Sequence, residues 1–142
     1  MTITDAIAFA AQRHKRQTDK AGAPYIWHPL RVAMRLDCGD AQLAAVLHDV
    51  LEDTKTTEQE LRRRGVPLRV LEALRLLTKR PDDGSRYLQF IRRLKVNAIA
   101  RVVKEADILD NLDPGRLALL APEERRRLKA KYRPALVELR KR

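Results

Sequence analysis

The sequence predicts an all-α fold, and three observations support that prediction. Glycine and proline are scarce, with 5 Gly and 7 Pro in 142 residues, which argues against a loop-rich or all-β protein. No segment alternates apolar and polar residues convincingly, so strands are not expected beyond an isolated pair. Apolar residues instead recur at helical spacing between short breaks. The length suits one domain, and we expect residues 1–142 to form a single compact bundle of seven to eight helices.

The first three helices follow from the N-terminal pattern. Apolar residues at helical spacing predict a helix over residues 4–15, and the segment 16–27 that follows is expected to be a loop. Pro29 fits the first turn of a second helix that runs to Asp37. Asp40 is a suitable cap for a third helix. The third helix is expected to bury an apolar stripe of Leu43, Ala44, Leu47 and Val50 or Leu51.

Capping residues mark the next three helices. Thr57 and Glu60 have the spacing of a capping box and predict a short helix that ends at Gly65. Pro67 opens a fifth helix, and Ser85 is expected to cap a sixth. The fifth helix is expected to turn four residues inward: Val70, Leu71, Leu74 and Leu77.

Two further helices complete the bundle. A seventh is expected over residues 96–111 and is broken at 113–115, where the sequence reads Asp-Pro-Gly. Pro122 begins a last basic helix, which we expect to be kinked or interrupted at Pro134. The apolar side of the seventh helix is predicted to contain Ile99, Val102, Val103 and Ala106.

The positive charge is concentrated in the second half of the chain. The net charge is +11, but residues 1–60 carry 7 Lys+Arg against 9 Asp+Glu, a balance of −2, and residues 61–142 carry 23 against 10, a balance of +13. Such a basic half fits nucleic acid, another polyanionic ligand, or simply solvated helix faces. Nucleic acid is not favoured, because no aromatic residues are interleaved with the basic runs.

Composition also bears on location. Cys38 is the only cysteine, which excludes an internal disulfide and fits a reducing cytoplasm. The apolar runs are too short to span a membrane, and the N-terminus lacks the pattern of a signal peptide. We therefore expect a cytoplasmic protein without a membrane partner; the sequence leaves its oligomeric state open.

Titratable residues are densest between His48 and Asp53 on the predicted third helix. At about 100° per residue, His48 and Glu52 share one face, and Asp49 and Asp53 form the neighbouring row. Three carboxylates at the edge of a buried face repel one another unless a cation lies nearby. The alternative is an acidic helix end whose carboxylates are merely solvated.

Two more segments add potential ligands. His28 lies at the start of a predicted helix, where a structural or capping role is equally compatible with its position. Asp107 lies on an otherwise apolar helix with Asn111 one turn later. Two histidines and two carboxylates drawn from three helices suit a divalent ion such as Mn²⁺, with positions left for water and substrate.

These residues form a recognisable pattern. The run Leu47-His48-Asp49-Val50-Leu51-Glu52-Asp53-Thr54, downstream of Pro24-Tyr25-Ile26-Trp27-His28-Pro29, resembles the HD-domain metal-dependent phosphohydrolases. Within them it is most similar to the hydrolase domain of RelA/SpoT-type alarmone enzymes and their small stand-alone relatives. The similarity covers about residues 4–115 and includes Leu77-Thr78-Lys79, Tyr87, Asp107 and Asp110-Asn111-Leu112.

The resemblance implies an HD-type helical bundle, a reaction and a set of roles. The reaction is removal of the 3′-pyrophosphate of guanosine tetra- or pentaphosphate, which leaves GDP or GTP and pyrophosphate. Metal ligands, to Mn²⁺ in this family although another divalent transition metal is compatible, would be His28, His48, Asp49 and Asp107. Glu52 and Asp53 would handle the attacking water and its proton, and Lys20 and Asn111 would contact the nucleotide. No synthetase domain is expected.

The base-contacting loop departs from the family pattern. Asp19 stands where the family has an arginine that stacks on guanine, and Arg16 is the residue left to substitute for it. Asp19→Arg is therefore expected to improve guanine-nucleotide affinity. Two alternatives stay open: a phosphohydrolase of another nucleotide, such as a nucleoside triphosphate or NADPH, and, less favoured, a basic RNA-associated module.

Overall fold

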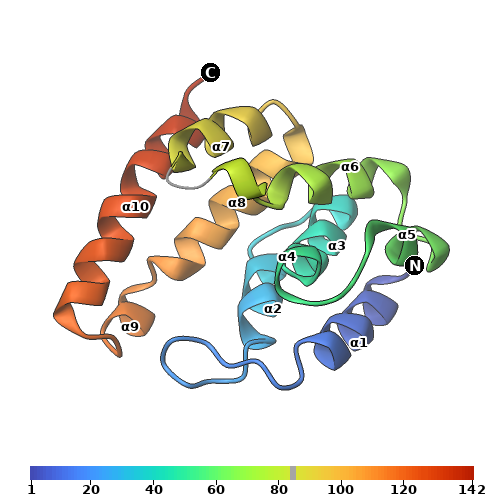
Figure 1. The fold of residues 1–142 in the computed structure, drawn as a ribbon, viewed down its shortest axis with the longest axis horizontal. Helices are drawn as coiled ribbons and strands as arrows, with labels where there is room; N and C mark the ends of the chain where they lie inside the picture. Colours follow the sequence, from blue (N-terminus) through green and yellow to red (C-terminus); the bar gives the residue numbers. More distant parts are fainter. Residues whose placement is uncertain (84–85) are drawn as a thin grey trace.

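The helix α3 lies at the centre of the fold and packs against α1, α2, α6 and α8. The computed structural model describes residues 1–83 and 86–142 (Figure 1). Six of the nine residues of α3 are buried, and its C-terminal part, from Leu43 to Leu47, is buried throughout, which is the pattern of a helix segment enclosed on all sides. The helices in chain order are α1 Ile3–Arg13, α2 Trp27–Met34, α3 Gly39–Leu47, α4 Val50–Asp53, α5 Glu58–Arg63, α6 Leu68–Leu77, the 3₁₀ turn η1 Pro81–Asp83, α7 Tyr87–Leu94, α8 Ala98–Asn111, α9 Pro114–Leu117 and α10 Pro122–Arg140.

The C-terminal helices cover the other side of α8. Figure 1 shows α8 running diagonally between α10 and the group formed by α1, α2 and α3. The long helix α10 packs on α7 and α8, and α2 and α3 pack on the opposite part of α8. The α1–α2 connection runs along the lower edge of the molecule toward α9 in this view. Residues from both ends of the chain therefore meet around α8.

The predicted all-α class is confirmed. Within the described residues the sole extended pairing is an isolated bridge between Thr18 and Pro24. Within residues 1–83 and 86–142 the expected seven to eight helices become ten α-helices, because the predicted third helix is divided and a short α9 follows Asp113. The side chain of Asp113 caps α9 by accepting the Arg116 N–H, so the Asp-Pro-Gly segment ends one helix and starts another. In the part of the chain that is described, no helix has both the length and the apolar character needed to cross a membrane.

The predicted third helix is wrong in one important detail: it is broken at His48 and Asp49, between α3 and α4. The Ala45 carbonyl oxygen accepts a hydrogen bond from the His48 side chain, with Nδ1 at 2.6 Å, and it also receives the His48 backbone N–H at 3.4 Å. That carbonyl is the one an uninterrupted helix would offer to Asp49. The histidine side chain thus competes with the helix backbone and breaks the helix at the residues of interest.

Most helix ends lie where the sequence predicts them. Thr57 caps α5, but the expected capping box is only half formed, because Glu60 pairs with Arg13 at 2.5 Å instead of the Thr57 backbone. Gly65 ends that helix at a φ of +89°, as its residue type predicts. Pro67 precedes α6, whose inward stripe is buried as expected. The predicted cap Ser85 lies outside the described residues.

The apolar face of α8 and the path of α10 differ from expectation. Val103 and Ala106 are buried, but Val102 is 41% exposed and does not belong to the buried side. The buried face instead includes three charged residues: Lys104, Asp107 and Asp110. The last helix is not interrupted at Pro134 and runs on to Arg140. The charges buried on α8 are the feature that leads to the functional site.

Candidate functional site

Two histidines and two aspartates meet between α2, the α3–α4 junction and α8. His28 Nε2 lies 2.9 Å from Asp107 Oδ1 and 3.9 Å from Asp49 Oδ2. His48 Nε2 lies 3.0 Å from Asp49 Oδ2 and 3.6 Å from Asp107 Oδ1. Ligand atoms of His28, His48 and Asp49 all lie within 4.8 Å of one another. Four groups that are distant in sequence therefore converge on one point.

Each histidine is oriented by a hydrogen bond on the far side of its ring. His48 Nδ1 faces the Ala45 carbonyl oxygen, and His28 Nδ1 lies 2.6 Å from Asp110 Oδ2. Asp110 is in turn held by Arg31 and Arg116, both at 2.8 Å. Burial opposes ionisation of Asp110, but its hydrogen bonds from His28 and Arg31 lower its pKa to about 2. Both rings thus present Nε2 to the shared centre.

The two aspartates are also held from behind. Tyr25 Oη donates to Asp49 Oδ2, while Lys104 Nζ donates to Asp107 Oδ2 at 2.8 Å. Burial raises the pKa of Asp107, but Lys104 and the histidines outweigh it and hold the pKa well below its usual range. For Asp49, burial acts in the same direction and is outweighed by His48. Both carboxylates are therefore ionised at neutral pH.

The arrangement calls for a cation at its centre. A carbonyl oxygen only accepts, so Nδ1 of His48 carries a proton, and Nε2 is the ring nitrogen that faces Asp49. His48 Nε2 is buried and makes no hydrogen bond within the described part of the chain. Burial disfavours imidazolium, although the carboxylates raise the pKa of both His28 and His48. A divalent ion could take the place of a proton between each Nε2 and the carboxylates, so the residues present could hold a metal.

Glu52 and Asp53 lie beside this centre, at the end of the one-turn helix α4. Both line the same cavity as His28, Asp49 and Asp107. Burial, followed by the nearby Asp49 charge, raises the pKa of Glu52 and of Asp53. Carboxylates with raised pKa values are better proton acceptors near neutral pH than carboxylates with ordinary pKa values.

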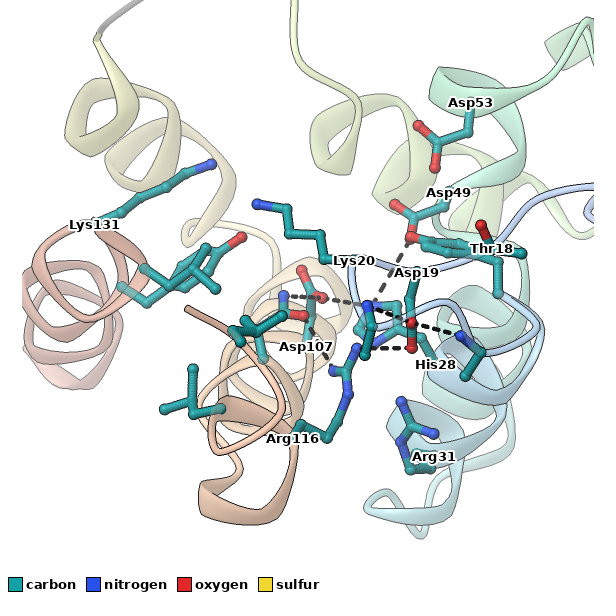
Figure 2. Close-up of a pocket in the computed structure, with 18 of the residues that line it drawn as sticks. Thr18, Asp19, Lys20, His28, Arg31, Asp49, Asp53, Asp107, Arg116 and Lys131 are labelled. Carbon is teal, nitrogen blue, oxygen red and sulfur yellow. Dashed lines mark hydrogen bonds and ion pairs between the residues drawn. The ribbon is translucent and has the colours of Figure 1, made fainter. Parts of the chain in front are cut away.

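The cavity above the centre has a volume of about 510 Å³. Figure 2 shows Lys131 reaching into it from α10, across from Asp49 and Asp53. Lys79 and Lys131 both lie against the Tyr87 ring, at 5.1 and 4.7 Å from its centroid. Burial and the neighbouring Lys79 charge lower the pKa of Lys131 to about 8. One wall of the cavity is therefore cationic and aromatic, whereas its floor is the carboxylate–histidine cluster.

Comparisons with known proteins agree with this geometry. The chain is 35% identical over 120 residues to a guanosine-3′,5′-bis(diphosphate) 3′-pyrophosphohydrolase of Aquifex aeolicus, over 78% of this chain and 17% of that protein. It is 31% identical over 141 residues to the bifunctional (p)ppGpp synthase/hydrolase SpoT of Escherichia coli, over 89% of this chain and 19% of that protein. A solved structure of a metazoan orthologue of SpoT, described as hydrolysing ppGpp, superposes with a TM-score of 0.82 at 24% identity, over 97% of this chain and 85% of that one. The chain is an HD-type, RelA/SpoT hydrolase-like domain.

The hydrolase-like domain spans less than a fifth of the length of these curated relatives. No model of a protein family matches it. Four of the residues quoted for the resemblance, His28, His48, Asp49 and Asp107, are those that the fold brings together at the cluster. The fold and the family resemblance predicted from the sequence are therefore confirmed.

The structure brings most of the predicted site residues of the hydrolase-like domain to the cavity. Lys20 lines it, with Nζ held 2.5 Å from Glu124 Oε1 on α10. Asn111 also lines it and donates through Nδ2 to Asp107 Oδ1 at 3.2 Å. Arg16 is exposed and is not among the lining residues, so the structure does not bring it to the cavity.

Asp19 has a structural role in the loop between α1 and α2. Its Oδ1 accepts the backbone N–H groups of Ala21 and Ala23, both at 2.9 Å, around Gly22 at a φ of +86°. Its Oδ2 lies 3.6 Å from Arg116 Nη2. The aspartate therefore shapes the loop and faces a cation supplied by α9, which argues against the expectation that an arginine here would improve binding.

Asp19→Arg is expected to destabilise the hydrolase-like domain and to weaken nucleotide binding. The variant loses the acceptor for two loop N–H groups and places a second cation beside Arg116, at a cost of about 1–3 kcal/mol of unfolding free energy. Thermal unfolding and KM for guanine nucleotides measure both effects. Asp19→Asn keeps the Oδ1 acceptor and is the matched control, with near-wild-type behaviour expected. Tighter binding by Asp19→Arg at an unchanged Tm would restore the original expectation.

Several residues of the site are absent from the sequence-based set. The sequence did contain a clue to Lys104 and Asp110. Each lies three residues from Asp107 on the same predicted helix, and a charge on an apolar helix face needs a partner. Lys79 lies within the family-like run Leu77-Thr78-Lys79 but was given no role, and Lys131, 52 positions later in a strongly basic half of the chain, carried no signal. Their proximity at Tyr87 is visible only in the folded molecule.

Proposed function

We propose that the chain catalyses Mn²⁺-dependent hydrolysis of the 3′-pyrophosphate of guanosine tetra- or pentaphosphate, giving GDP or GTP and pyrophosphate. The observation that carries the proposal is the convergence of His28, His48, Asp49 and Asp107 beside two carboxylates in one cavity. The names of the relatives from Aquifex aeolicus and Escherichia coli support the choice of substrate.

In this proposal the four converging residues hold the ion. When bound, a divalent ion lowers the pKa of a water and stabilises charge on a phosphoryl group. His28 and His48 would ligate through Nε2, since each Nδ1 is already engaged by Asp110 or by Ala45. The donor set of nitrogen and oxygen is compatible with Mn²⁺ and with other divalent transition metals.

Glu52 and Asp53 are assigned to the attacking water. Their carboxylates line the cavity beside Asp49 and have raised pKa values, so they can orient the water and accept its proton. Ionised Asp49 and Asp107 are unsuited to that task, because Lys104 and the histidines hold their pKa values low.

The cationic wall is assigned to the phosphates of the nucleotide. Lys79 and Lys131 lie together at the cavity, both over the Tyr87 ring, an arrangement whose mutual repulsion a polyanion relieves. Lys20 and Asn111 line the same cavity and complete the proposed contacts. A cytoplasmic location and the absence of a nucleic-acid partner stay predictions.

The first experiment measures pyrophosphate release from guanosine tetraphosphate with Mn²⁺ and with EDTA. GTP, dATP and NADPH are assayed in parallel, and circular dichroism follows the helical content. Metal-dependent release from the alarmone alone is the expected result. Release from another nucleotide would keep the chemistry and change the substrate, which the structural role of Asp19 makes the main alternative. Salt-sensitive RNA binding without any turnover would favour the RNA-associated module.

Lys131→Met is expected to raise KM about 10-fold while kcat changes little, because the proposal assigns this lysine to binding the phosphates and not to the attacking water. In the wild-type protein, KM should also rise above about pH 8, where Lys131 loses its proton. That part of the pH dependence should disappear in the variant. Lys129→Met on the same helix does not line the cavity and is the matched control. An unchanged KM for Lys131→Met would remove Lys131 from the binding site.

A further inference from the structure

A buried histidine that the proposed reaction does not use lies next to the site. His14 is the C-cap residue of α1, is 1% exposed, and packs its ring 5.0 Å from the Tyr25 ring. Its Nδ1 lies 2.8 Å from Gln17 Oε1. The other ring nitrogen makes no hydrogen bond with the described residues, so the contact with Gln17 is the polar interaction that fixes this side chain.

Gln17 connects this histidine to Asp53. Gln17 Nε2 donates to Asp53 Oδ2 at 3.2 Å. Since a carboxylate can only accept, the NH₂ end of the amide must face Asp53 and the oxygen must face His14. The amide oxygen in turn requires a proton on Nδ1 of His14. The orientation of one amide therefore determines the tautomer of a buried histidine.

The backbone holds Gln17 firmly in this place. Its N–H donates to the His14 carbonyl oxygen at 2.9 Å, and its own carbonyl oxygen accepts the Tyr25 N–H at 2.9 Å. Asp53, by contrast, is the last residue of a one-turn helix and is exposed. Gln17 is therefore held in place by its backbone and by His14, whereas Asp53 has the freedom that a positioning contact can restrict.

We propose that Gln17, oriented by His14, is a positioning residue for Asp53. The hydrogen bond fixes Oδ2 and restricts rotation of the carboxylate, so that Oδ1 can be directed at the attacking water. A neutral amide suits this task, because a lysine in its place would stabilise the ionised carboxylate more strongly and make it a weaker proton acceptor. The inference rests on the proposed function, in which Asp53 accepts the proton of the water.

The test combines kinetics with a double-mutant cycle. Gln17→Met has a similar length but no donor, and we expect kcat to fall about 10-fold to 100-fold with KM within about 2-fold. In an Asp53→Asn background, assayed with excess enzyme, the same substitution should cause no further loss. Lys15→Met, on the exposed face of the same turn, is the matched control. A wild-type kcat for Gln17→Met, or an equal loss in both backgrounds, would overturn the positioning role.

A second measurement does not depend on turnover. Nitrogen-15 NMR of the histidine rings should show His14 protonated at Nδ1 in the wild-type protein, and Gln17→Met should alter its ring signals. His14 protonated only at Nε2 would overturn the inference whatever the activity. If the wild-type protein hydrolyses no nucleotide in the panel, the proposed function fails, while the NMR result still decides whether the His14–Gln17–Asp53 contact exists.

Discussion

Asp107→Ala is expected to abolish both metal binding and hydrolysis. Asp107 Oδ1 faces both histidine Nε2 atoms, at 2.9 and 3.6 Å, and is the contribution of α8 to the centre. The substitution also leaves Lys104 buried without its counter-charge, which costs about 3–5 kcal/mol of stability. Bound-metal analysis by mass spectrometry, pyrophosphate-release assays and thermal unfolding measure the three effects.

The control for Asp107 must separate lost ligation from lost stability. Combining Asp107→Asn with Lys104→Met preserves the side-chain volumes and removes the unpaired lysine, so this double variant should fold and yet bind no metal. Glu105→Ala on the same helix removes only a surface ion pair with Arg140 and should behave as wild type. Wild-type metal content in the double variant would exclude Asp107 from the ligands.

Glu52→Gln and Asp53→Asn are expected to lower kcat by about 10²-fold to 10⁴-fold, the range for loss of a general base. Each variant keeps the shape of the side chain but cannot accept a proton. Because neither residue belongs to the converging cluster, bound metal and Tm should stay at wild-type values. Pre-steady-state and steady-state rates with Mn²⁺, together with metal analysis of the same samples, test the assignment.

A matched control for the two carboxylates is available on α6. Glu72→Gln changes an exposed glutamate that does not line the cavity, and its activity should be unchanged. An empty metal site in Glu52→Gln or Asp53→Asn would contradict the roles given to these residues. Since burial and Asp49 raise the pKa of both carboxylates, activity should fall on the acidic side as they take up protons.

Local signals in the sequence were sufficient for most helices. Gly65, Pro67 and Thr57 mark helix ends through backbone preferences that act within a few residues, and the structure agrees with each. The prediction failed where a side chain competes with the backbone. His48 takes the Ala45 carbonyl and breaks a segment whose apolar pattern indicated one continuous helix.

The sequence also identified the residues that form the centre, because their types and spacing match a known family. It could not show how those residues are held. Asp110 orients His28 from 82 positions away, and Lys104 neutralises Asp107 from the same helix. The contact between Asp110 and His28 depends on how α2 and α8 pack, and packing is not encoded in any short window of residues.

The sequence by itself therefore determined the helical class, most helix ends and the chemical identity of the cluster. Helix periodicity and capping are local properties that can be read from a few neighbouring residues. The histidines and carboxylates of the cluster can likewise be recognised from their order and spacing along the chain. Tertiary structure alone decided that Lys79 and Lys131 share a wall, that Asp19 faces Arg116, and that Gln17 reaches Asp53. These facts arise from long-range packing, where charges far apart in sequence are brought within a few ångströms and their energies depend on burial.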